Sequence, residues 1–169
     1  MVMIDMTARP TTSSFDTFYA REYQPMVALA AAVSGKGLIA EDLAQEALIR
    51  AHRNRSKSSG FDKPGAWLRR VTINLASTAR RRRRAEEDAR VRLVPTHATT
   101  ELEFHDETIW SAVAGLSPKR RAAIALFYLE DCSVVEISRV LRCSVNTAKA
   151  HLHQGRASLA AHLAMEEER

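Results

Sequence analysis

The sequence predicts an all-α protein with two small helical domains joined by a flexible linker. Aromatic residues make up 6% of the chain, and Ala, Leu and Val dominate its apolar residues, which favours helices over sheets. Apolar residues recur at spacings of three and four, and no segment stands out as a strand. Pro and Thr interrupt this pattern near the middle of the chain, where apolar residues are few. We therefore expect domains over 13–91 and 102–165, with a linker over 92–101.

The first domain should contain three helices. The helical pattern over 13–34 ends at two closely spaced glycines, and Pro25 inside it should bend or restart the helix. A second helix is predicted over Ile39–Arg53, where Leu and Ala residues share one face. Asp62 can cap a third helix with Pro64 in its first turn, and this helix continues into a run of arginines.

The second domain should contain four helices, over about 102–114, 117–129, 133–141 and 144–163. Their starts carry residues that cap helices. Ser117 precedes a proline at the first helical position. Ser133 and Glu136 form the pattern of a capping box, and Ser144 is followed three residues later by Thr147.

Positive charge is concentrated in the centre of the sequence. The chain carries a net charge of +5 and has a pI of about 9.6. Residues 46–84 hold twelve Lys or Arg against two Asp or Glu, a local charge of +10, which leaves −5 for the rest of the chain. This asymmetry indicates a directed surface for a polyanion such as nucleic acid.

The segment 133–156 has the pattern of a helix-turn-helix. The apolar residues that would form the shared core of its two helices are Ile137, Val140, Leu141, Val145, Ala148 and Leu152. The opposite face of the second helix carries side chains of types that reach base edges and phosphates: Asn146, Lys149, Ala150, His153, Gln154 and Arg156. Arg142 stands in the turn where glycine is common, and a left-handed conformation there would cost about 1 kcal/mol. A surface helix pair with a solvated polar face is the alternative.

The third predicted helix forms a second basic element. It carries Trp67, Asn74 and five consecutive arginines: Arg80, Arg81, Arg82, Arg83 and Arg84. Five consecutive residues surround a helix, so these arginines cannot all face one groove, and we expect them to neutralise phosphates. A solvated charge run at the end of a domain is the alternative. Trp67 could pack in the core or stack on a base.

A polar loop precedes this helix. It carries Arg53, Asn54 and Phe61 among several serines. Such a loop could hold an extruded base between an aromatic ring and hydrogen-bonding groups.

An acidic cluster marks the start of the second helix. The residues of this cluster are Glu41, Asp42, Gln45 and Glu46, and acidic residues at this position suit the helix dipole. Alternatively, they form a polar docking face for a basic partner.

The sequence does not predict catalysis, a cofactor or a metal site. It contains no phosphate loop, nucleophile motif or metal cluster, and Cys132 and Cys143 lack metal-type spacing. With no disulfide framework, no apolar run near the roughly 20 residues of a membrane span, and no signal-peptide pattern over 1–14, we expect a cytoplasmic protein without membrane insertion.

Three segments, in this order, resemble the extracytoplasmic-function (ECF) class of bacterial RNA polymerase sigma factors. Region two, which docks on the clamp helices of the polymerase β′ subunit, is similar to IAEDLAQEALIRAHR (39–53). The helix that opens the promoter at its minus-ten element is similar to PGAWLRRVTINLASTARRRRR (64–84). Region four, which reads the minus-35 element, resembles LSPKRRAAIALFYLEDCSVVEISRVLRCSVNTAKAHLHQGRASL (116–159).

The resemblance implies a role for each group of residues. The contacts to the polymerase clamp would be Asp42, Gln45 and Glu46. The minus-ten strand would meet Arg53, Asn54, Phe61, Trp67 and Asn74, with the arginines of 80–84 on nearby phosphates. The minus-35 element would meet Asn146, Lys149, Ala150, His153, Gln154 and Arg156. Several of these residues differ from the family's common ones, so the promoter sequence is not predicted.

The resemblance also implies the partners. These are core RNA polymerase, through the β′ clamp helices and the β flap, promoter DNA and an anti-sigma factor. The chain would then be a non-catalytic subunit that directs initiation. A helix-turn-helix regulator of the LuxR type, binding DNA as a homodimer, explains 133–156 equally well but leaves the acidic and arginine-rich helices unexplained. A third possibility is an antagonist that docks on polymerase through 39–53 without initiating transcription.

Overall fold

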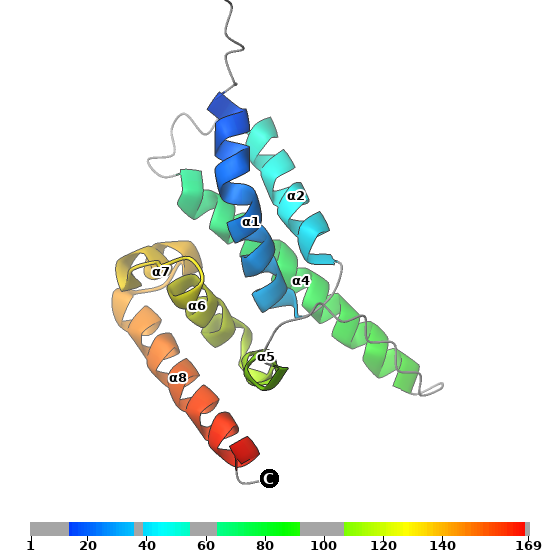
Figure 1. Ribbon diagram of the computed structural model, residues 1–169, viewed down its shortest axis with the longest axis vertical. Helices are drawn as coiled ribbons and strands as arrows, with labels where there is room; N and C mark the ends of the chain where they lie inside the picture. Colours follow the sequence, from blue (N-terminus) through cyan, green and yellow to red (C-terminus); the bar gives the residue numbers. More distant parts are fainter. Residues whose placement is uncertain (1–13, 36–38, 55–63, 92–106, 168–169) are drawn as a thin grey trace, which may run out of the picture.

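The structure is a computed structural model that describes residues 14–35, 39–54, 64–91 and 107–167, and every regular element in these ranges is an α-helix (Figure 1). The helices are α1 (Ser14–Ser34), α2 (Ile39–Arg53), α4 (Pro64–Val91), α5 (Glu107–Gly115), α6 (Pro118–Tyr128), α7 (Val134–Leu141) and α8 (Val145–Glu167). The predicted all-α class is confirmed, and α2 has the predicted bounds. The predicted linker over 92–101 and the predicted cap Asp62 lie outside the described residues.

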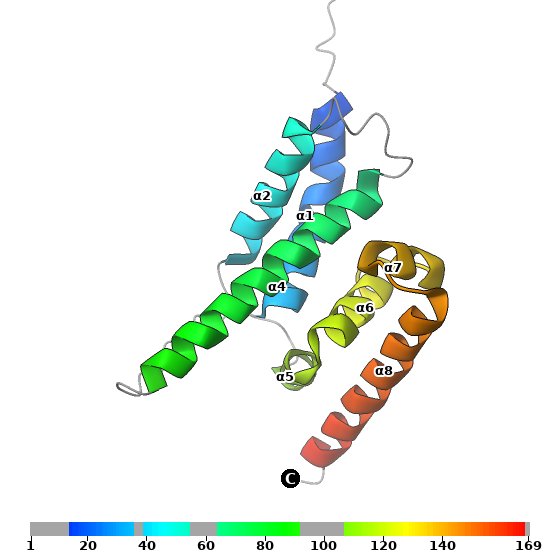
Figure 2. The ribbon, with the colours of Figure 1, turned by 180° about the vertical axis from the view of Figure 1, so that it is seen from behind.

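Helices α1, α2 and α4 pack side by side as the first unit (Figures 1 and 2). Its centre is apolar, with Met26, Leu48 and Leu68 fully buried. Thr72 is also buried, and its hydroxyl donates to the carbonyl of Leu68 at 3.0 Å, so the burial of this polar group is compensated. The unit is therefore held by one apolar face from each helix.

Helix α1 continues through Pro25 as one element, so of the two predicted effects of this proline, a bend or a restart, the restart does not occur. Its neighbours explain this: Met26 and Leu29, which follow the proline, are fully buried, so packing holds the helix together. Gly35 ends the helix as predicted, with φ of 90° and its N–H donating to the carbonyl of Ala31 at 2.9 Å.

Helices α5 to α8 form the second unit, in which α6 and α7 both pack against α8 (Figure 1). Gly155 of α8 faces α6 at close range. A Cβ atom at this position would lie 2.8 Å from Cγ1 of Ile124 and 3.8 Å from Cβ of Arg120. The missing side chain therefore allows α6 and α8 to approach one another.

The predicted helix caps of this unit can be checked individually. The capping box is confirmed, because the N–H of Glu136 donates to the hydroxyl of Ser133 and the carboxylate accepts from the backbone N–H of Ser133 at 2.9 Å. Ser144 is confirmed as a cap through its 3.0 Å bond from the N–H of Thr147. Ser117 occupies the cap position of α6 but makes no capping hydrogen bond with its side chain, so that part of the prediction is wrong.

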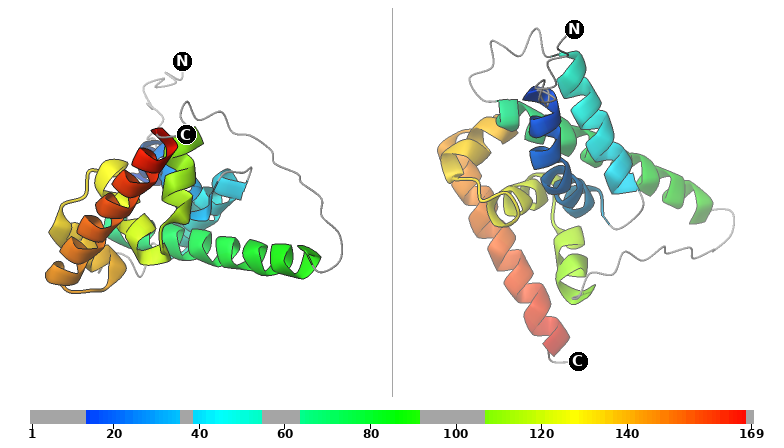
Figure 3. Two further views of the ribbon diagram at one scale, coloured as in Figure 1. Left: turned by 90° about the horizontal axis from the view of Figure 1, so that it is seen from below. Right: turned by 45° about the horizontal axis from the view of Figure 1, so that its top comes forward.

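The two units pack against each other. Helix α1 contacts α5 and α6, and α4 contacts α7. Buried apolar side chains of both units belong to one continuous cluster, which includes Leu29 and Leu68 from the first and Leu126 and Ile137 from the second. The carboxyl-terminal turns of α4 project beyond this packed body (Figure 3). In the part of α4 that precedes these turns, some side chains pack inside the first unit and others contact the second unit.

Candidate nucleic-acid interface

The predicted helix-turn-helix consists of α7 and α8. The shared core is formed as predicted by Ile137, Val140, Leu141, Ala148 and Leu152, which are all buried. Val145 was predicted to join them, but it is 37% exposed, because it stands in the first turn of α8, beyond the reach of the α7 core. The core thus lies on one face of α8 and leaves the other face to solvent.

A left-handed residue forms the turn between the two helices. Arg142 has φ of 52° and ψ of 53°, as its position in place of glycine predicted. The next residue closes the turn, because the N–H of Cys143 donates to the carbonyl of Ser138 at 3.0 Å. The geometry of the turn is therefore fixed by backbone hydrogen bonds in spite of the non-glycine residue.

The predicted DNA-contacting side chains of α8 are all exposed, namely those of Asn146, Lys149, Ala150, His153, Gln154 and Arg156. Two of them are held by α6, which the sequence did not indicate. The carbonyl oxygen of Gln154 accepts from Nη2 of Arg120 at 2.8 Å and from Nε at 3.1 Å. Nε of Arg156 donates to the hydroxyl of Tyr128 at 2.9 Å, and its guanidinium lies 4.7 Å from the ring centre of Phe127.

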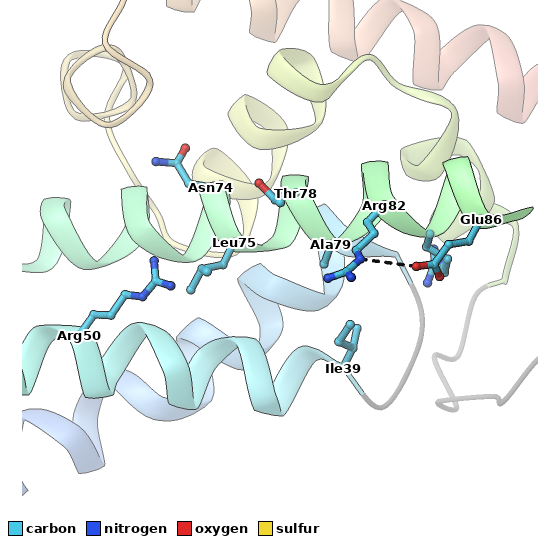
Figure 4. A pocket seen from close by; sticks show the side chains of 9 residues that line it. Ile39, Arg50, Asn74, Leu75, Thr78, Ala79, Arg82 and Glu86 are labelled. Atoms are coloured by element: carbon cyan, nitrogen blue, oxygen red, sulfur yellow. Dashed lines mark ion pairs between the residues drawn. The ribbon is translucent and has the colours of Figure 1, made fainter.

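The amino-terminal part of α4 holds two of the predicted minus-ten residues. Trp67 is half-buried and packs against the core cluster, as one of its two predicted roles requires. Asn74 is exposed and lines a groove of about 620 Å³ between α2 and α4 (Figure 4). Arg50, Arg82 and Arg83 line the same groove. Thr78 and Glu86 also line it, and the carboxylate of Glu86 pairs with Arg82 at 3.5 Å (Figure 4). The amide and the guanidinium groups at this border are suited to a base and its phosphates.

The run of five arginines divides between two environments. Arg80 donates to the carbonyl of Ala114 at 2.7 Å, and Arg80 and Arg83 both donate to the carbonyl of Ser34, at 3.4 Å and 3.1 Å. They thus neutralise the carboxyl end of α1, and burial together with the adjacent arginines lowers the pKa of Arg80. The exposed arginines of the run are Arg81, Arg82 and Arg84. Arg80 is therefore half-buried and bonded to the ends of other helices, whereas the three exposed arginines face solvent.

The predicted polymerase contacts lie together on α2. Asp42 and Gln45 are exposed, and Glu46 is half-buried and forms an ion pair with Arg50 at 2.7 Å. Arg53, at the end of the same helix, is exposed, and the amide of Asn54 donates to the carbonyl of Arg50 at 2.9 Å. Phe61 lies outside the described residues. The predicted polymerase contacts therefore lie toward the amino-terminal end of α2, and the predicted nucleic-acid residues Arg53 and Asn54 lie at its carboxyl-terminal end.

Sequence reasoning missed a set of charged residues that join the two units. Nε of Arg69 pairs with Oε2 of Glu130 at 2.8 Å, and Arg70 donates to the carbonyls of Arg139 at 2.6 Å and Val140 at 3.1 Å. Helix periodicity treats charged residues as surface residues, and it gave no indication that these would be covered by a segment about 60 residues away.

Arg121 is the most deeply placed of these cations, since only 2% of it is exposed. It donates to the carbonyls of Val113 at 3.1 Å, Ala114 at 2.9 Å and Leu116, and across the interface to that of Val33 at 3.3 Å. Burial and the nearby Arg80 lower the pKa of Arg121 to about 10. A buried guanidinium that satisfies several helix-end carbonyls is therefore the centre of the contact between the units.

The described residues contain no grouping of three or more His, Cys, Asp or Glu side chains that could hold a metal ion. Nor does any helix among them have both the length and the apolarity that crossing a bilayer requires.

Each unit of the chain matches the model of a known protein family. Residues 18–86 match the model of sigma-70 region 2, and residues 106–159 match that of sigma-70 region 4. The ECF RNA polymerase sigma factor SigW of Bacillus subtilis is 32% identical over 137 residues, which cover 71% of this chain and 73% of that protein. The ECF RNA polymerase sigma factor EcfG of Rhodopseudomonas palustris is 32% identical over 140 residues, which cover 79% of this chain and 76% of that protein.

Solved structures agree on the fold. The sigma factor RpoE in complex with the anti-sigma factor NepR from Bartonella quintana superposes with a TM-score of 0.71 at 24% identity, over 88% of this chain and 96% of that one. CnrH in complex with the cytosolic domain of CnrY superposes with a TM-score of 0.66 at 22% identity, over 89% of this chain and 88% of that one. The models of regions 2 and 4 match the two helical units, and both relatives are more than 30% identical to the chain. This chain therefore belongs to the ECF class of RNA polymerase sigma factors, which direct promoter-specific transcription initiation.

Proposed function

We propose that this sigma factor binds core RNA polymerase through the acidic face of α2. The residues that would meet the β′ clamp helices are Asp42, Gln45 and Glu46, and the second unit would meet the β flap. The exposure of Asp42 and Gln45 supports this role, as does the position of this face away from the contact with the second unit. Glu46 would exchange its ion pair with Arg50 for a cation of the polymerase, which has a small cost at a half-exposed pair.

The groove between α2 and α4 would take the unpaired minus-ten strand. Asn74, Arg82 and Arg83 border it, and the predicted loop residues Arg53 and Phe61 would extend it. Opening duplex DNA costs about 1.4 kcal/mol per base-pair step, whereas stacking on an aromatic ring contributes roughly 1–3 kcal/mol per base. With few aromatic side chains on this surface, the sigma factor alone would melt DNA poorly and would depend on polymerase.

Helix α8 would read the duplex minus-35 element. The observation that carries the whole proposal is that α4 and α8 present separate polar faces on two units of one chain, beside an acidic α2. A dimeric duplex-binding regulator needs α8 alone. A non-catalytic initiation subunit needs all three, and this role places the protein in the cytoplasm with the polymerase.

We further propose that the packed arrangement is a resting form that opens on the promoter. The minus-ten and minus-35 elements are separated by roughly 25 base pairs, or ~85 Å at 34–36 Å per helical turn. Helices α4 and α7 are in direct contact through Arg70, so the packed form cannot reach both elements at once. An anti-sigma factor, of the kind bound to RpoE in its solved complex with NepR, would bind and stabilise this packed arrangement.

Reconstituted transcription tests the proposal. Asp42→Lys with Glu46→Lys should abolish capture of core polymerase and run-off transcription. Glu41→Lys, at an exposed acidic residue of the same helix that is not among the proposed contacts, should leave both intact. Lys149→Ala should change which promoters are used without loss of core binding. Initiation that survives the double charge reversal, or promoter choice that ignores α8, would contradict the proposal.

A further inference from the structure

The amide of Gln154 is held in one orientation by Arg120. Both N–H groups of the guanidinium that reach it, Nη2 at 2.8 Å and Nε at 3.1 Å, donate to the same carbonyl oxygen. Arginine has donors only, so the oxygen of the amide, and not its nitrogen, must face Arg120. Both donors belong to one edge of the guanidinium and approach the oxygen from one side, so the contact holds the oxygen against Arg120 and turns the NH2 group of Gln154 away from it.

Arg120 is itself held in place by the packing of α6 on α8. It is half-buried, and its Cβ lies 3.8 Å from the position that a Cβ of Gly155 would occupy, next to Gln154 in the sequence. The stem of the arginine therefore rests on the part of α8 that lacks a side chain. This support limits the rotamers of Arg120 before any DNA is bound, which is the condition for a preorganised contact.

Base recognition by a glutamine depends on which of its groups is available. The usual pairing with adenine uses the oxygen to accept from N6 and the nitrogen to donate to N7. With its oxygen held against Arg120, Gln154 presents its NH2 group, which can only donate. Guanine presents two acceptors in the major groove, O6 and N7, and thymine presents O4, whereas cytosine presents a donor and adenine presents one donor beside its acceptor.

We propose that Arg120 is a positioning residue that holds the oxygen of Gln154 and leaves its NH2 group to meet the DNA, so that α8 selects at this point a base with acceptors on its major-groove edge and disfavours adenine and cytosine. The inference rests on the proposed role of α8 at the minus-35 element. It adds a residue on α6 to the determinants of promoter choice, although Arg120 lies outside the helix that enters the groove.

The test uses the full chain, assembled with core RNA polymerase, on a promoter library with the minus-35 element randomised. Gln154→Ala identifies the base pair that Gln154 reads, as the position where preference is lost. Arg120→Met keeps an apolar stem on Gly155 but removes the donors. It should raise the use of adenine relative to guanine at that one pair by about fivefold or more, the scale of one good base contact. Arg120→Lys, which can still donate to the oxygen, should keep most of the original preference.

One measurement keeps the proposal falsifiable if Arg120→Met is poorly folded, which its thermal unfolding would reveal. With the wild-type protein, 7-deazaguanine at the identified position removes one acceptor and should weaken initiation, and it should have no effect on Gln154→Ala. If Arg120→Met folds, adding it to Gln154→Ala should leave the base preference of Gln154→Ala unchanged.

Other results would overturn the inference. An unchanged preference in Arg120→Met would show that the amide is not constrained during recognition. A uniform loss on all promoters, with a salt dependence reduced by about one charge, would make Arg120 a phosphate contact. If Lys149→Ala alters promoter choice in either case, the proposed function of α8 stands without this inference. If neither Lys149→Ala nor Gln154→Ala alters it, the proposed function fails and the inference fails with it.

Discussion

Replacing Arg69 by Met should separate the two helical units. Only 2% of the Glu130 side chain is exposed. Its Oε2 accepts from Nε of Arg69 at 2.8 Å across the contact between the units. Its other oxygen, Oε1, is buried without a hydrogen-bond partner among the residues that the structure describes. Loss of Arg69 would leave a buried charge with no compensation, and opening the units returns that charge to water.

The size of the effect follows from this burial. Removing one partner of a buried ion pair costs about 3–5 kcal/mol, and since 24% of the Arg69 side chain is exposed, we expect the lower end of this range. That corresponds to a change of about 100-fold or more in the ratio of packed to open molecules. Glu130→Gln in the Arg69→Met background should restore most of the packing, because a neutral amide needs no counter-charge.

Small-angle X-ray scattering of the free protein measures the outcome as an increase in the radius of gyration. Arg81→Met is the matched control, since Arg81 is an exposed arginine of the same helix. An unchanged radius for Arg69→Met would refute the reasoning. So would an equal expansion of Arg81→Met, which would show that the total charge of α4, and not the ion pair, governs the packing.

The pH dependence provides an independent check. Burial, opposed by Arg69 and reinforced by Glu22 and Asp131, raises the pKa of Glu130. The packed form therefore binds this proton more tightly than the open form. Its contribution to packing is complete below the ordinary glutamate pKa of about 4.3 and is lost as the pH rises through the raised value. Acidification should make Arg69→Met compact again, and the double variant with Glu130→Gln should not respond.

Three further predictions concern stability, each measured by thermal unfolding. Gly155→Ala should destabilise the protein by about 1 kcal/mol, since overpacking against Ile124 costs about 1–3 kcal/mol and the gain in helix propensity returns about 1 kcal/mol, whereas Gly115→Ala, with no atom within 4 Å of the added Cβ, should not lower the midpoint. Ser133→Ala should cost about 1 kcal/mol by removing the capping box, and an unchanged midpoint would show that the hydrogen bonds of Ser133 carry no net stability. Arg142→Gly should stabilise the turn by about 0.5 kcal/mol, because relief of a left-handed arginine exceeds the added freedom of the unfolded chain; destabilisation would contradict this.

Local structure could be predicted from the sequence because local chemistry determines it. The bounds of α2, the capping box at Ser133 and the left-handed turn at Arg142 depend on residues within a few positions of one another. The exposed face of α8 follows in the same way from the helical repeat. The error at Val145 arose at the first turn of a helix, where periodicity identifies a face but not how far the partner helix extends.

Contacts between distant segments could not be predicted in this way. Nothing around Arg121 distinguishes it from Lys119 and Arg120, yet it alone of the three is buried and bonded to helix ends of both units. The same holds for the arginine run, in which Arg80 turns inward and Arg81 outward. Sequence patterns supply the number of cations, and only the folded chain decides which of them meet carbonyl groups.

The bare backbone at Gly155 has an evolutionary consequence. Because α6 rests on it, this position can never become a contact to DNA, although its neighbours on both sides point outward. A residue much larger than alanine there would press on Ile124 and push α6 and α8 apart, which would displace the base-contacting side chains of α8 together. Promoter preference can therefore change gradually through substitutions at Arg120 and Gln154, provided that residue 155 remains glycine.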